Sequence, residues 1–371
     1  MRILRISPYF YEKKENIDGG LKPYYYNLIL TLKKYKITHQ IITADSDSFE
    51  NKNIFKIRKR KRLNYLLMGY DAYKIIRKNK IKYDIIHVHN PIFFLLFHYK
   101  NRLGKIVYTN HGSPFAIKYV PAKTIADFKD MLYNYIFNRY ICKRADAIIL
   151  LSNQERDRVI KNYKIDKNNV YYIPTAADTR IFKPKNIKKD IDIIYAGRFA
   201  VKKNIPLLLK IIKDLKVKLP NIKVILIGGK KDDKDYKLIK SLIKTYNIEK
   251  NVEIVPKVPQ VKLANYYSRA KIFALMSFEE GMPKVLLEAM SCACIGISTK
   301  GFGMDEIIED QKNGFLVDLK WDYKKIYNVF EKALLNYNPK LGKEATKKIN
   351  SNFTWDIVSK NMLGIYKKLA P

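Results

Sequence analysis

Two glutamates in the C-terminal third of the chain, Glu280 and Glu288, are separated by seven residues. At this spacing both carboxylates could bind one ligand. Glu280 follows the apolar run 271–276, which is typical of a buried strand, and Glu288 lies in the apolar helical stretch that comes next. We expect the backbone N–H groups near Gly281 and Met282 to open that helix, with Glu288 about two turns into it. Such groups at the carboxyl edge of a parallel sheet would form an anion- and hydroxyl-binding surface.

A second set of candidate residues is basic. Arg198 and Lys203 occur in a Gly-Arg-x4-Lys-Asn pattern, between an apolar run and the helical stretch 205–215. A guanidinium offers a two-pronged donor and an ammonium a point charge, and together they suit a diphosphate. Lys202 competes with Lys203 for this assignment, and in so basic a chain a single lysine is more often a solvated surface charge.

The first half of the chain offers a glycine loop. Gly19 and Gly20 follow the first expected strand and precede a helix that begins near Pro23. Glycines let a backbone approach a ligand closely and leave helix-terminal N–H groups free for phosphate, although a plain turn would look the same. The spacing differs from the GxGxxG of dinucleotide enzymes.

One of the five histidines stands out by position. His111 follows the strand 106–109, and the carboxyl end of a parallel strand is a common place for a ligand. His87 and His89 alternate in a buried strand and are interpreted as core imidazoles. His39 and His98 have no motif around them.

Taken in order, these motifs resemble the retaining glycosyltransferases of family 4, which have the GT-B fold. The resemblance rests on the glycine loop, the His-Gly after the strand 106–109, the Gly-Arg-x4-Lys-Asn pattern and the run Glu-Gly-Met-Pro…Leu-Leu-Glu-Ala-Met. It covers nearly the whole chain. It implies catalytic roles for the following residues: His111, Glu280, Arg198 and Lys203. It implies donor-binding roles for the following residues: Gly19, Gly20, Arg198, Lys203, Glu280, Gly281, Met282, Pro283 and Glu288.

The resemblance also implies what each group does. Glu288 would accept hydrogen bonds from the ribose hydroxyls, and Glu280 with the neighbouring amides would hold the sugar hydroxyls. Arg198 and Lys203 would neutralise the leaving diphosphate in place of a metal, and His111 would donate a hydrogen bond to the transferred sugar. Since no residue is an obvious covalent nucleophile, we expect a front-face mechanism.

The arrangement of elements fits this fold class. Short β-branched runs alternate with amphipathic stretches in both halves, which indicates two α/β units with parallel sheets. The expected strands are 3–6, 40–43, 85–89, 106–109, 147–151, 170–173, 191–195, 224–227, 252–254, 272–276, 295–298 and 314–317. We expect two doubly wound, Rossmann-like domains facing a central cleft. Residues 1–177 would form the N-terminal acceptor-binding domain, and residues 178–354 the nucleotide-sugar-binding domain. A terminal helix, 355–371, would cross back to the first domain.

The charge of the chain is unusual. Its 371 residues carry 72 Lys+Arg against 35 Asp+Glu, a net charge of +37. Such an excess favours a polyanionic partner, although a Lys-rich compositional bias would explain part of it. No apolar run reaches the length of a membrane span, and no signal peptide is expected. The three cysteines form no paired framework and are interpreted as reduced thiols of a cytoplasmic protein.

The basic character peaks at Lys52 to Arg62, where seven of eleven residues are basic. The amphipathic stretch 63–78 follows it. This combination suits an anionic membrane surface, which we favour over the alternatives of nucleic acid and a solvated loop. We expect peripheral association with the inner face of the cell membrane.

Together these features predict a retaining hexosyltransferase. It would use a UDP- or GDP-sugar and a lipid-linked or membrane-presented glycan or glycolipid acceptor. The alternatives are another GT-B enzyme such as a sugar-nucleotide epimerase, or, less well supported, a charge-driven nucleic-acid-binding protein. Two Asp-x-Asp triplets, at 45–47 and 190–192, lie away from the Glu280 motif, so no metal or other cofactor is expected.

Overall fold

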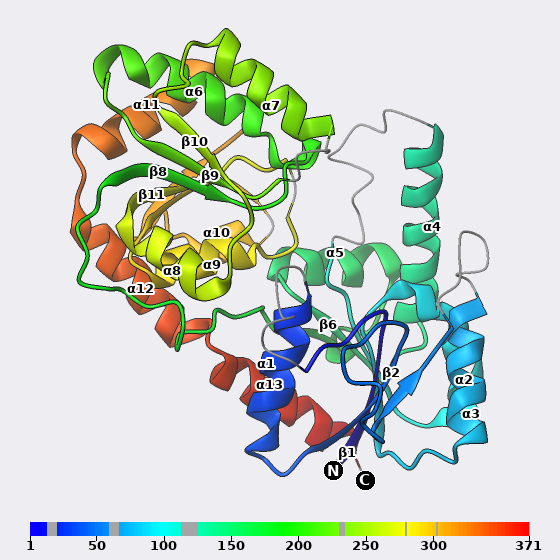
Figure 1. The fold of residues 1–371 in the computed structure, drawn as a ribbon. Coiled ribbons are helices and arrows are strands. Elements are labelled where there is room, and N and C mark those ends of the chain that lie inside the picture. The colour runs from blue at the N-terminus through cyan, green and yellow to red at the C-terminus, as the bar shows by residue number, and fades with distance from the viewer. Residues whose placement is uncertain are drawn as a thin grey trace. The chain divides into compact units, whose positions relative to one another are not determined.

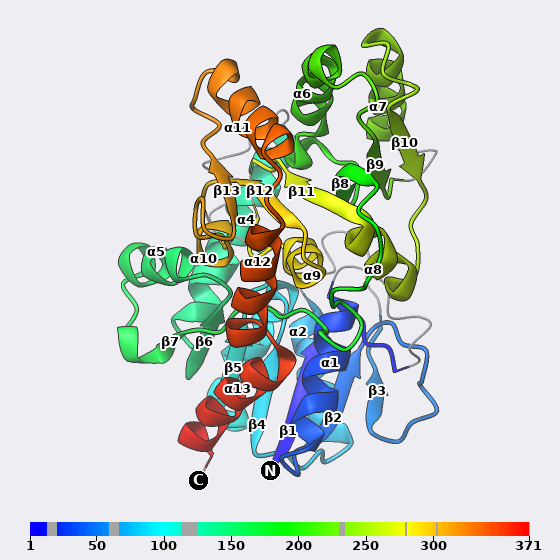
Figure 2. The ribbon, with the colours of Figure 1, turned by 90° about the vertical axis from the view of Figure 1, so that its left-hand side faces the viewer.

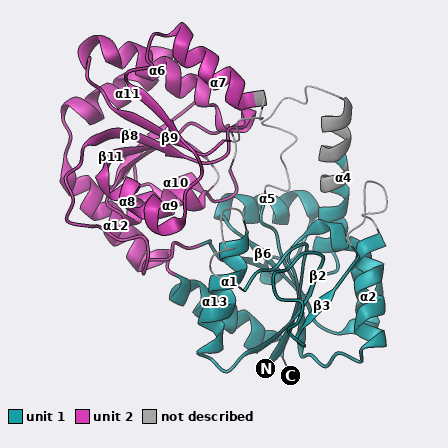
Figure 3. Ribbon diagram, viewed as in Figure 1, with its two compact units in different colours: residues 1–175, 355–371 teal, residues 176–354 magenta. Residues whose placement is uncertain are grey.

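The computed structural model describes residues 1–12, 21–58, 67–112, 125–229, 234–278, 280–301 and 303–370. The predicted glycine loop at Gly19 and Gly20 and positions 59–62 of the basic segment lie outside these residues. The chain divides into two compact units (Figure 3). Unit 1 is Met1–Thr175 with Trp355–Pro371, and unit 2 is Ala176–Thr354. The expected boundary after residue 177 lies close to this division.

Unit 1, coloured blue to green with its C-terminal helix in red (Figure 1), contains a seven-stranded parallel sheet. Its strand order, β3-β2-β1-β4-β5-β6-β7, can be followed in Figure 2. Its strands are β1 (Arg2–Ser7), β2 (Thr38–Thr43), β3 (Ile54–Lys56), β4 (Ile85–Val88), β5 (Ile106–Thr109), β6 (Ala147–Leu150) and β7 (Val170–Tyr172). Its helices are α1 (Lys22–Lys33), α2 (Met68–Lys78), η3 (Pro91–Tyr99), α3 (Lys100–Leu103), α4 (Ile125–Cys142), α5 (Asn153–Tyr163), η5 (Lys167–Asn169) and α13 (Trp355–Leu369).

The two faces of β1 differ in chemistry. Leu4 and Ile6 belong to a hydrophobic core shared with α2 and η3. Because side chains alternate across a strand, Ile3 and Arg5 point to the opposite face. Helices α1 and α13 pack against each other (Figure 2), and α13 supplies a side chain that contacts Arg5.

Unit 2 contains a six-stranded parallel sheet in the order β10-β9-β8-β11-β12-β13. Its strands are β8 (Ile191–Ala196), β9 (Val224–Ile227), β10 (Val252–Val255), β11 (Ala270–Leu275), β12 (Ile295–Thr299) and β13 (Gly314–Val317). Its helices are η6 (Val201–Lys203), α6 (Ile205–Lys218), α7 (Lys234–Thr245), α8 (Gln260–Arg269), α9 (Lys284–Ser291), α10 (Met304–Ile307), α11 (Tyr323–Leu335) and α12 (Pro339–Asn352). The central strands are near-continuous apolar runs, as expected where helices cover both faces of a parallel sheet.

The sequence predicted every strand of both sheets except β3, with nearly the bounds found here. This strand is three residues long and lies inside the basic segment, where Lys52, Lys56 and Arg58 are exposed. The apolar side of α2 packs against η3. Among the described residues no helix is both long and apolar enough to cross a bilayer.

Candidate functional site

The predicted residues of unit 2 meet at the carboxyl ends of two adjacent strands. Lys203 lies in η6 after β8, Glu280 follows β11, and β8 pairs with β11. The Lys203 ammonium forms an ion pair with Glu280 Oε1, and the Ser277 hydroxyl donates to the same oxygen at 2.7 Å. The two charged side chains are only 13% and 10% exposed. Burial strengthens the attraction between the two charges, and the hydrogen bond from Ser277 further orients the Glu280 carboxylate.

The structure also distinguishes Lys203 from Lys202, the other candidate for the diphosphate-binding lysine. The Phe278 N–H donates to the Lys202 carbonyl at 2.9 Å and ties the β11 loop to η6. The Lys202 side chain is exposed, whereas that of Lys203 points to Glu280. Of the two lysines, Lys203 belongs to the carboxylate site.

Arg198 lies at the same edge of the sheet, and its guanidinium is exposed to solvent. Its side chain makes no hydrogen bond or ion pair with a described residue, although its charge acts on Tyr195. Its carbonyl accepts a hydrogen bond from the Tyr195 hydroxyl at 2.9 Å, which positions the loop. Burial raises the pKa of Tyr195, and the charge of Glu280 raises it further. The exposed guanidinium is therefore available to an anion close to the Lys203–Glu280 pair.

A glycine contact sets the path of this loop. The Gly197 N–H donates to the Ile227 carbonyl at 2.9 Å. A Cβ atom on Gly228 would lie 2.0 Å from the Gly197 carbonyl oxygen, and Gly228 has a φ of +124°. Only glycine allows this approach. Gly228 was not among the predicted site residues, although its place directly after β9 is a signal that could have found it.

Helix α9 begins later than expected. It starts at Lys284, so Glu288 lies a little over one turn into it rather than about two. Pro283 is the N-cap, with extended angles of φ −76° and ψ 100°, and residues before proline avoid the helical region. The prediction that Gly281 and Met282 open the helix was wrong. They form the preceding turn, where the Gly303 N–H donates to the Gly281 carbonyl at 3.1 Å.

Glu288 has a partner that the sequence pattern alone did not identify. Its Oε1 lies 2.5 Å from the Lys284 ammonium, and the two side chains are 4% and 18% exposed. Burial raises the pKa of Glu288, and the charge of Lys284 opposes this shift. The i,i+4 spacing of Lys284 and Glu288 was a usable signal. The pair makes Glu288 a buried, oriented acceptor.

In unit 1, His111 belongs to a polar cluster on the sheet face opposite the α2 core. We call it the Arg5 cluster. Its members are Arg5, His39, His87, His89, Thr109, His111 and Tyr366. The parallel register pairs Arg5 with His87, and alternation along the strands brings the other odd-numbered members to the same face.

Arg5 is the centre of this cluster and is 2% exposed. Among the described residues no carboxylate pairs with it. Its Nη1 lies 3.2 Å from His87 Nδ1 and 3.0 Å from His89 Nε2. Its Nη2 donates to the Tyr366 hydroxyl at 3.0 Å, and its Nε donates to His39 Nδ1 at 3.4 Å. The neutral acceptors replace the hydration that the buried cation has lost.

The cluster extends to His111 through His89. The distance from His89 Nδ1 to His111 Nε2 is 3.2 Å, and the Tyr24 ring lies edge-on to His111 at 4.5 Å between centroids. Burial lowers the pKa of His111 to about 3 and that of His89 well below its usual range, where His87 and Arg5 add to the effect. These imidazoles are therefore neutral at physiological pH.

The prediction for His87 and His89 as buried, satisfied imidazoles is confirmed. Their joint connection to Arg5 and His111 was missed. The signal was the odd-number alternation of polar residues on four neighbouring strands, β2, β1, β4 and β5. It becomes visible only once the strand order is known.

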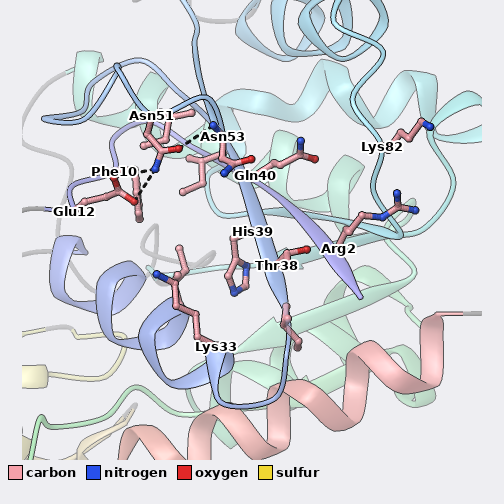
Figure 4. A pocket seen from close by; sticks show the side chains of 14 residues that line it. Arg2, Phe10, Glu12, Lys33, Thr38, His39, Gln40, Asn51, Asn53 and Lys82 are labelled. Atoms are coloured by element: carbon pink, nitrogen blue, oxygen red, sulfur yellow. Dashed lines mark hydrogen bonds between the residues drawn. The ribbon is translucent and has the colours of Figure 1, made fainter.

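A pocket of about 590 Å³ also lies in unit 1 (Figure 4). Its lining includes Arg2, Lys33 and Lys82, together with His39, whose Nε2 has no partner among the described residues. None of the predicted site residues lines it.

The Asp-x-Asp triplets have structural partners. Asp190 holds Arg269 through contacts of 2.8 and 2.5 Å, and Asp192 accepts from Lys271 at 2.7 Å. The Tyr11 hydroxyl donates to the first aspartate of the other triplet, at position 45. Within the described ranges no three His, Cys, Asp or Glu side chains are grouped so that they could hold a metal ion.

Family models match both units of the chain. Residues 18–181 match the model described as Glycosyltransferase Family 4, and residues 177–351 match the model described as Glycosyl transferases group 1.

Two relatives show how far the similarity extends. The chain is 24% identical over 304 residues to a phosphatidylinositol N-acetylglucosaminyltransferase subunit of Arabidopsis thaliana, covering 79% of this chain and 63% of that protein. It therefore spans less than two thirds of the plant protein. It is 27% identical over 373 residues to an uncharacterized glycosyltransferase of Methanocaldococcus jannaschii, with 95% of each chain covered.

Solved structures share the architecture. The sucrose-phosphate synthase of Thermosynechococcus elongatus superposes with a TM-score of 0.82 at 20% identity, over 99% of this chain and 98% of that one. Anabaena HepE in complex with UDP-glucose gives a TM-score of 0.76 at 15% identity, over the full length of both chains. At these identities the likeness establishes the fold, which is GT-B. With a matching model for each unit, the chain belongs to the group 1 glycosyltransferases of family 4.

Proposed function

We propose that this protein is a retaining glycosyltransferase that moves a hexose from a nucleotide diphosphate sugar to an acceptor hydroxyl. The observation that carries the proposal is the edge of the unit 2 sheet. There the buried Lys203–Glu280 pair and the exposed guanidinium of Arg198 lie at the same edge of the sheet, and the charges of Glu280 and Arg198 both act on the buried Tyr195. One buried cation, one exposed cation and an oriented carboxylate suit a ligand that combines a diphosphate with sugar hydroxyls.

Each group has a role in this proposal. Arg198 and Lys203 bind the diphosphate. Glu280, oriented by Ser277 and Lys203, accepts from the sugar hydroxyls. Glu288, desolvated and held by Lys284, accepts from the ribose. The roles come from the family resemblance, and the contacts explain how the side chains are held for them.

The proposed reaction proceeds on one face of the sugar. The bond between the anomeric carbon and the diphosphate oxygen breaks, and its electron pair stays on the diphosphate. The acceptor oxygen bonds to the same face of that carbon and passes its proton to the departing phosphate oxygen. Arg198 and Lys203 stabilise the charge that develops there, so the proposed reaction needs no metal. His111 orients the sugar.

The donor is proposed to be a UDP- or GDP-sugar, and the acceptor a lipid-linked or membrane-presented glycan or glycolipid. Anabaena HepE was solved with UDP-glucose, and the Arabidopsis relative is named for transfer to phosphatidylinositol. The exposed residues Lys52, Lys56 and Arg58 and the net charge of +37 support a cytoplasmic enzyme at an anionic membrane surface. Because the apolar side of α2 is packed on η3, this membrane proposal rests on charge alone.

A transfer assay tests the reaction. The purified protein is incubated with UDP-glucose, UDP-N-acetylglucosamine or GDP-mannose and a membrane lipid extract, with and without EDTA. We expect one donor to yield free nucleotide diphosphate and a glycolipid whose anomeric configuration, determined from the one-bond C1–H1 coupling, matches that of the donor. EDTA should not affect the transfer. An inverted anomer or a loss of transfer in EDTA would overturn the mechanism. A changed sugar nucleotide formed without acceptor would favour an epimerase.

Vesicle binding tests the membrane proposal separately. The protein should sediment with phosphatidylglycerol vesicles at low salt and remain free with phosphatidylcholine vesicles. Lys52→Ser with Lys56→Ser and Arg58→Ser should weaken binding by several-fold. A matched triple variant on the exposed lysines of α11 and α12, Lys324→Ser with Lys325→Ser and Lys347→Ser, should have a smaller effect. Equal loss in both variants would show that only total charge matters.

A further inference from the structure

The geometry points to Arg5 as a positioning residue: acting through His89, it fixes His111 as the tautomer whose proton is on Nδ1. His111 then offers Nδ1–H as its hydrogen-bond donor. The role of that donor toward the transferred sugar rests on the proposed function. The tautomer itself follows from the contacts of unit 1 alone.

The argument begins with the guanidinium, which donates hydrogen bonds and never accepts them. Arg5 Nη1 lies 3.0 Å from His89 Nε2, so that nitrogen must carry a lone pair. A neutral imidazole has one N–H, and the proton of His89 is therefore on Nδ1.

The tautomer of His89 in turn determines that of His111. His89 Nδ1–H lies 3.2 Å from His111 Nε2 and donates to it. His111 Nε2 is thus an acceptor, and the remaining proton of His111 is on Nδ1. That atom is buried and has no partner among the described residues. A buried N–H without an acceptor costs free energy, and an acceptor oxygen that reached it would recover this cost.

Two further histidines are fixed by the same cation. Arg5 Nε donates to His39 Nδ1, and Nη1 donates to His87 Nδ1. Both rings must therefore carry their proton on Nε2. For His87 this is consistent with its 2.7 Å contact from Nε2 to the Thr109 hydroxyl.

Helix α13 takes part in this arrangement. The Tyr366 hydroxyl accepts from Arg5 Nη2 at 3.0 Å and lies 2.6 Å from His87 Nδ1. The Tyr366 hydroxyl therefore contacts Nη2 of Arg5, whereas His89 contacts Nη1. The two contacts together fix the orientation of the guanidinium plane. The C-terminal helix thus helps to orient His111 through Arg5 and His89.

Long-range ¹H–¹⁵N correlation spectra of the full chain with labelled histidine test the inference. The chain has five histidines, and single His→Gln variants assign them. Near neutral pH we expect Nδ1–H forms for His89 and His111, and Nε2–H forms for His39 and His87. The exposed His98 is the internal reference for an unconstrained ring. A His111 ring with its proton on Nε2, or with both nitrogens protonated, would overturn the inference.

Two substitutions at His89 distinguish a hydrogen-bonding role in orienting His111 from a role in packing alone. The side chain of His89→Gln can accept from Arg5 and donate to His111, so His111 should keep the Nδ1–H form. His89→Leu cannot donate, and His111 should become a mixture of tautomers. We expect the leucine variant to lose at least tenfold in kcat, with KM for the donor little changed, and the glutamine variant to recover most of it.

The outcomes distinguish this inference from the proposed function. If the spectra show the expected tautomers but no nucleotide sugar is turned over, the transferase proposal fails and the positioning by Arg5 stands. If transfer occurs but His111 keeps one tautomer in the leucine variant, the role of His89 is wrong. Should the leucine variant not fold, the spectrum of the parent chain still decides the tautomer.

Discussion

Mild acid should destabilise unit 1 selectively, because the Arg5 cluster holds its histidines neutral. A histidine in the unfolded chain has a pKa of about 6.5. Burial lowers the pKa of His39 to about 2 and that of His111 to about 3, and lowers those of His87 and His89 well below their usual range. The unfolded state therefore binds protons that the folded state does not. The stability contributed by these rings is present above about pH 6.5 and is lost as the pH falls below it.

The size of the effect follows from linkage. Between about pH 7.5 and pH 5.5, each histidine that stays neutral when folded reduces the free energy of unfolding by about 1.4 kcal/mol. The fully buried pair, His87 and His89, accounts for about 3 kcal/mol, and His39 and His111 add up to about the same again. A whole domain is stable by only about 5–15 kcal/mol. In unit 2 burial raises the pKa of Glu288, which acts in the opposite direction.

The two tryptophans allow unit 1 to be followed alone. Trp355 is buried in α13 beside Tyr24, whereas Trp321 is in unit 2. In a Trp321→Phe background, urea unfolding followed by fluorescence at the two pH values measures the loss. His87→Gln should reduce that loss by about 1.4 kcal/mol, whereas His98→Gln, at an exposed position, should leave it unchanged. Equal stability at both pH values would refute the account of a neutral cluster.

Two substitutions in unit 2 give further expectations. Gly228→Ala places a methyl group against the Gly197 carbonyl, so nucleotide affinity measured by calorimetry should fall at least tenfold, while Gly364→Ala, which meets open space, should bind normally. Unchanged affinity in Gly228→Ala would show that the Gly197 loop is not part of the site. Glu288→Gln should weaken uridine and UDP alike by about tenfold, or about 1.4 kcal/mol, and leave pyrophosphate unaffected, because its proposed partner is the ribose. A loss confined to pyrophosphate would contradict that role and point to the Lys284 contact instead.

Most strands were predictable because the central strands of a parallel sheet are largely apolar on both faces. In β1 and β4, where Arg5 and His87 interrupt the pattern, the neighbouring isoleucines still indicate a strand. The missed strand, β3, lies at the sheet edge, and its two apolar residues are surrounded by lysines. The start of α9 was placed too early because the apolar pattern around Met282 continues through a proline that caps the helix. Patterns of apolar residues locate elements better than they locate their ends.

The site was predictable where a motif lies within one loop and less so where it depends on strand order. Glu280 and Lys203 were found as separate motifs, but their ion pair needs the adjacency of β8 and β11. The Arg5 cluster draws on β1, β2, β4 and β5 and on a distant helix, where Arg5 contacts Tyr366 with a sequence separation of 361. No local pattern contains that information.

Nucleotide binding tests the central claim most directly. The thermal stability of the protein is measured with UDP, GDP and ADP and their sugar conjugates, with and without magnesium, and the response is compared in Arg198→Ala and in Lys202→Ala as the matched control. We expect one nucleotide to stabilise the protein without magnesium, by about 2.7 kcal/mol at a hundredfold excess over its dissociation constant. The response should be lost in Arg198→Ala and kept in Lys202→Ala. A folded protein that responds to no nucleotide, or whose two variants respond equally, would contradict a nucleotide-sugar transferase built on this edge of unit 2.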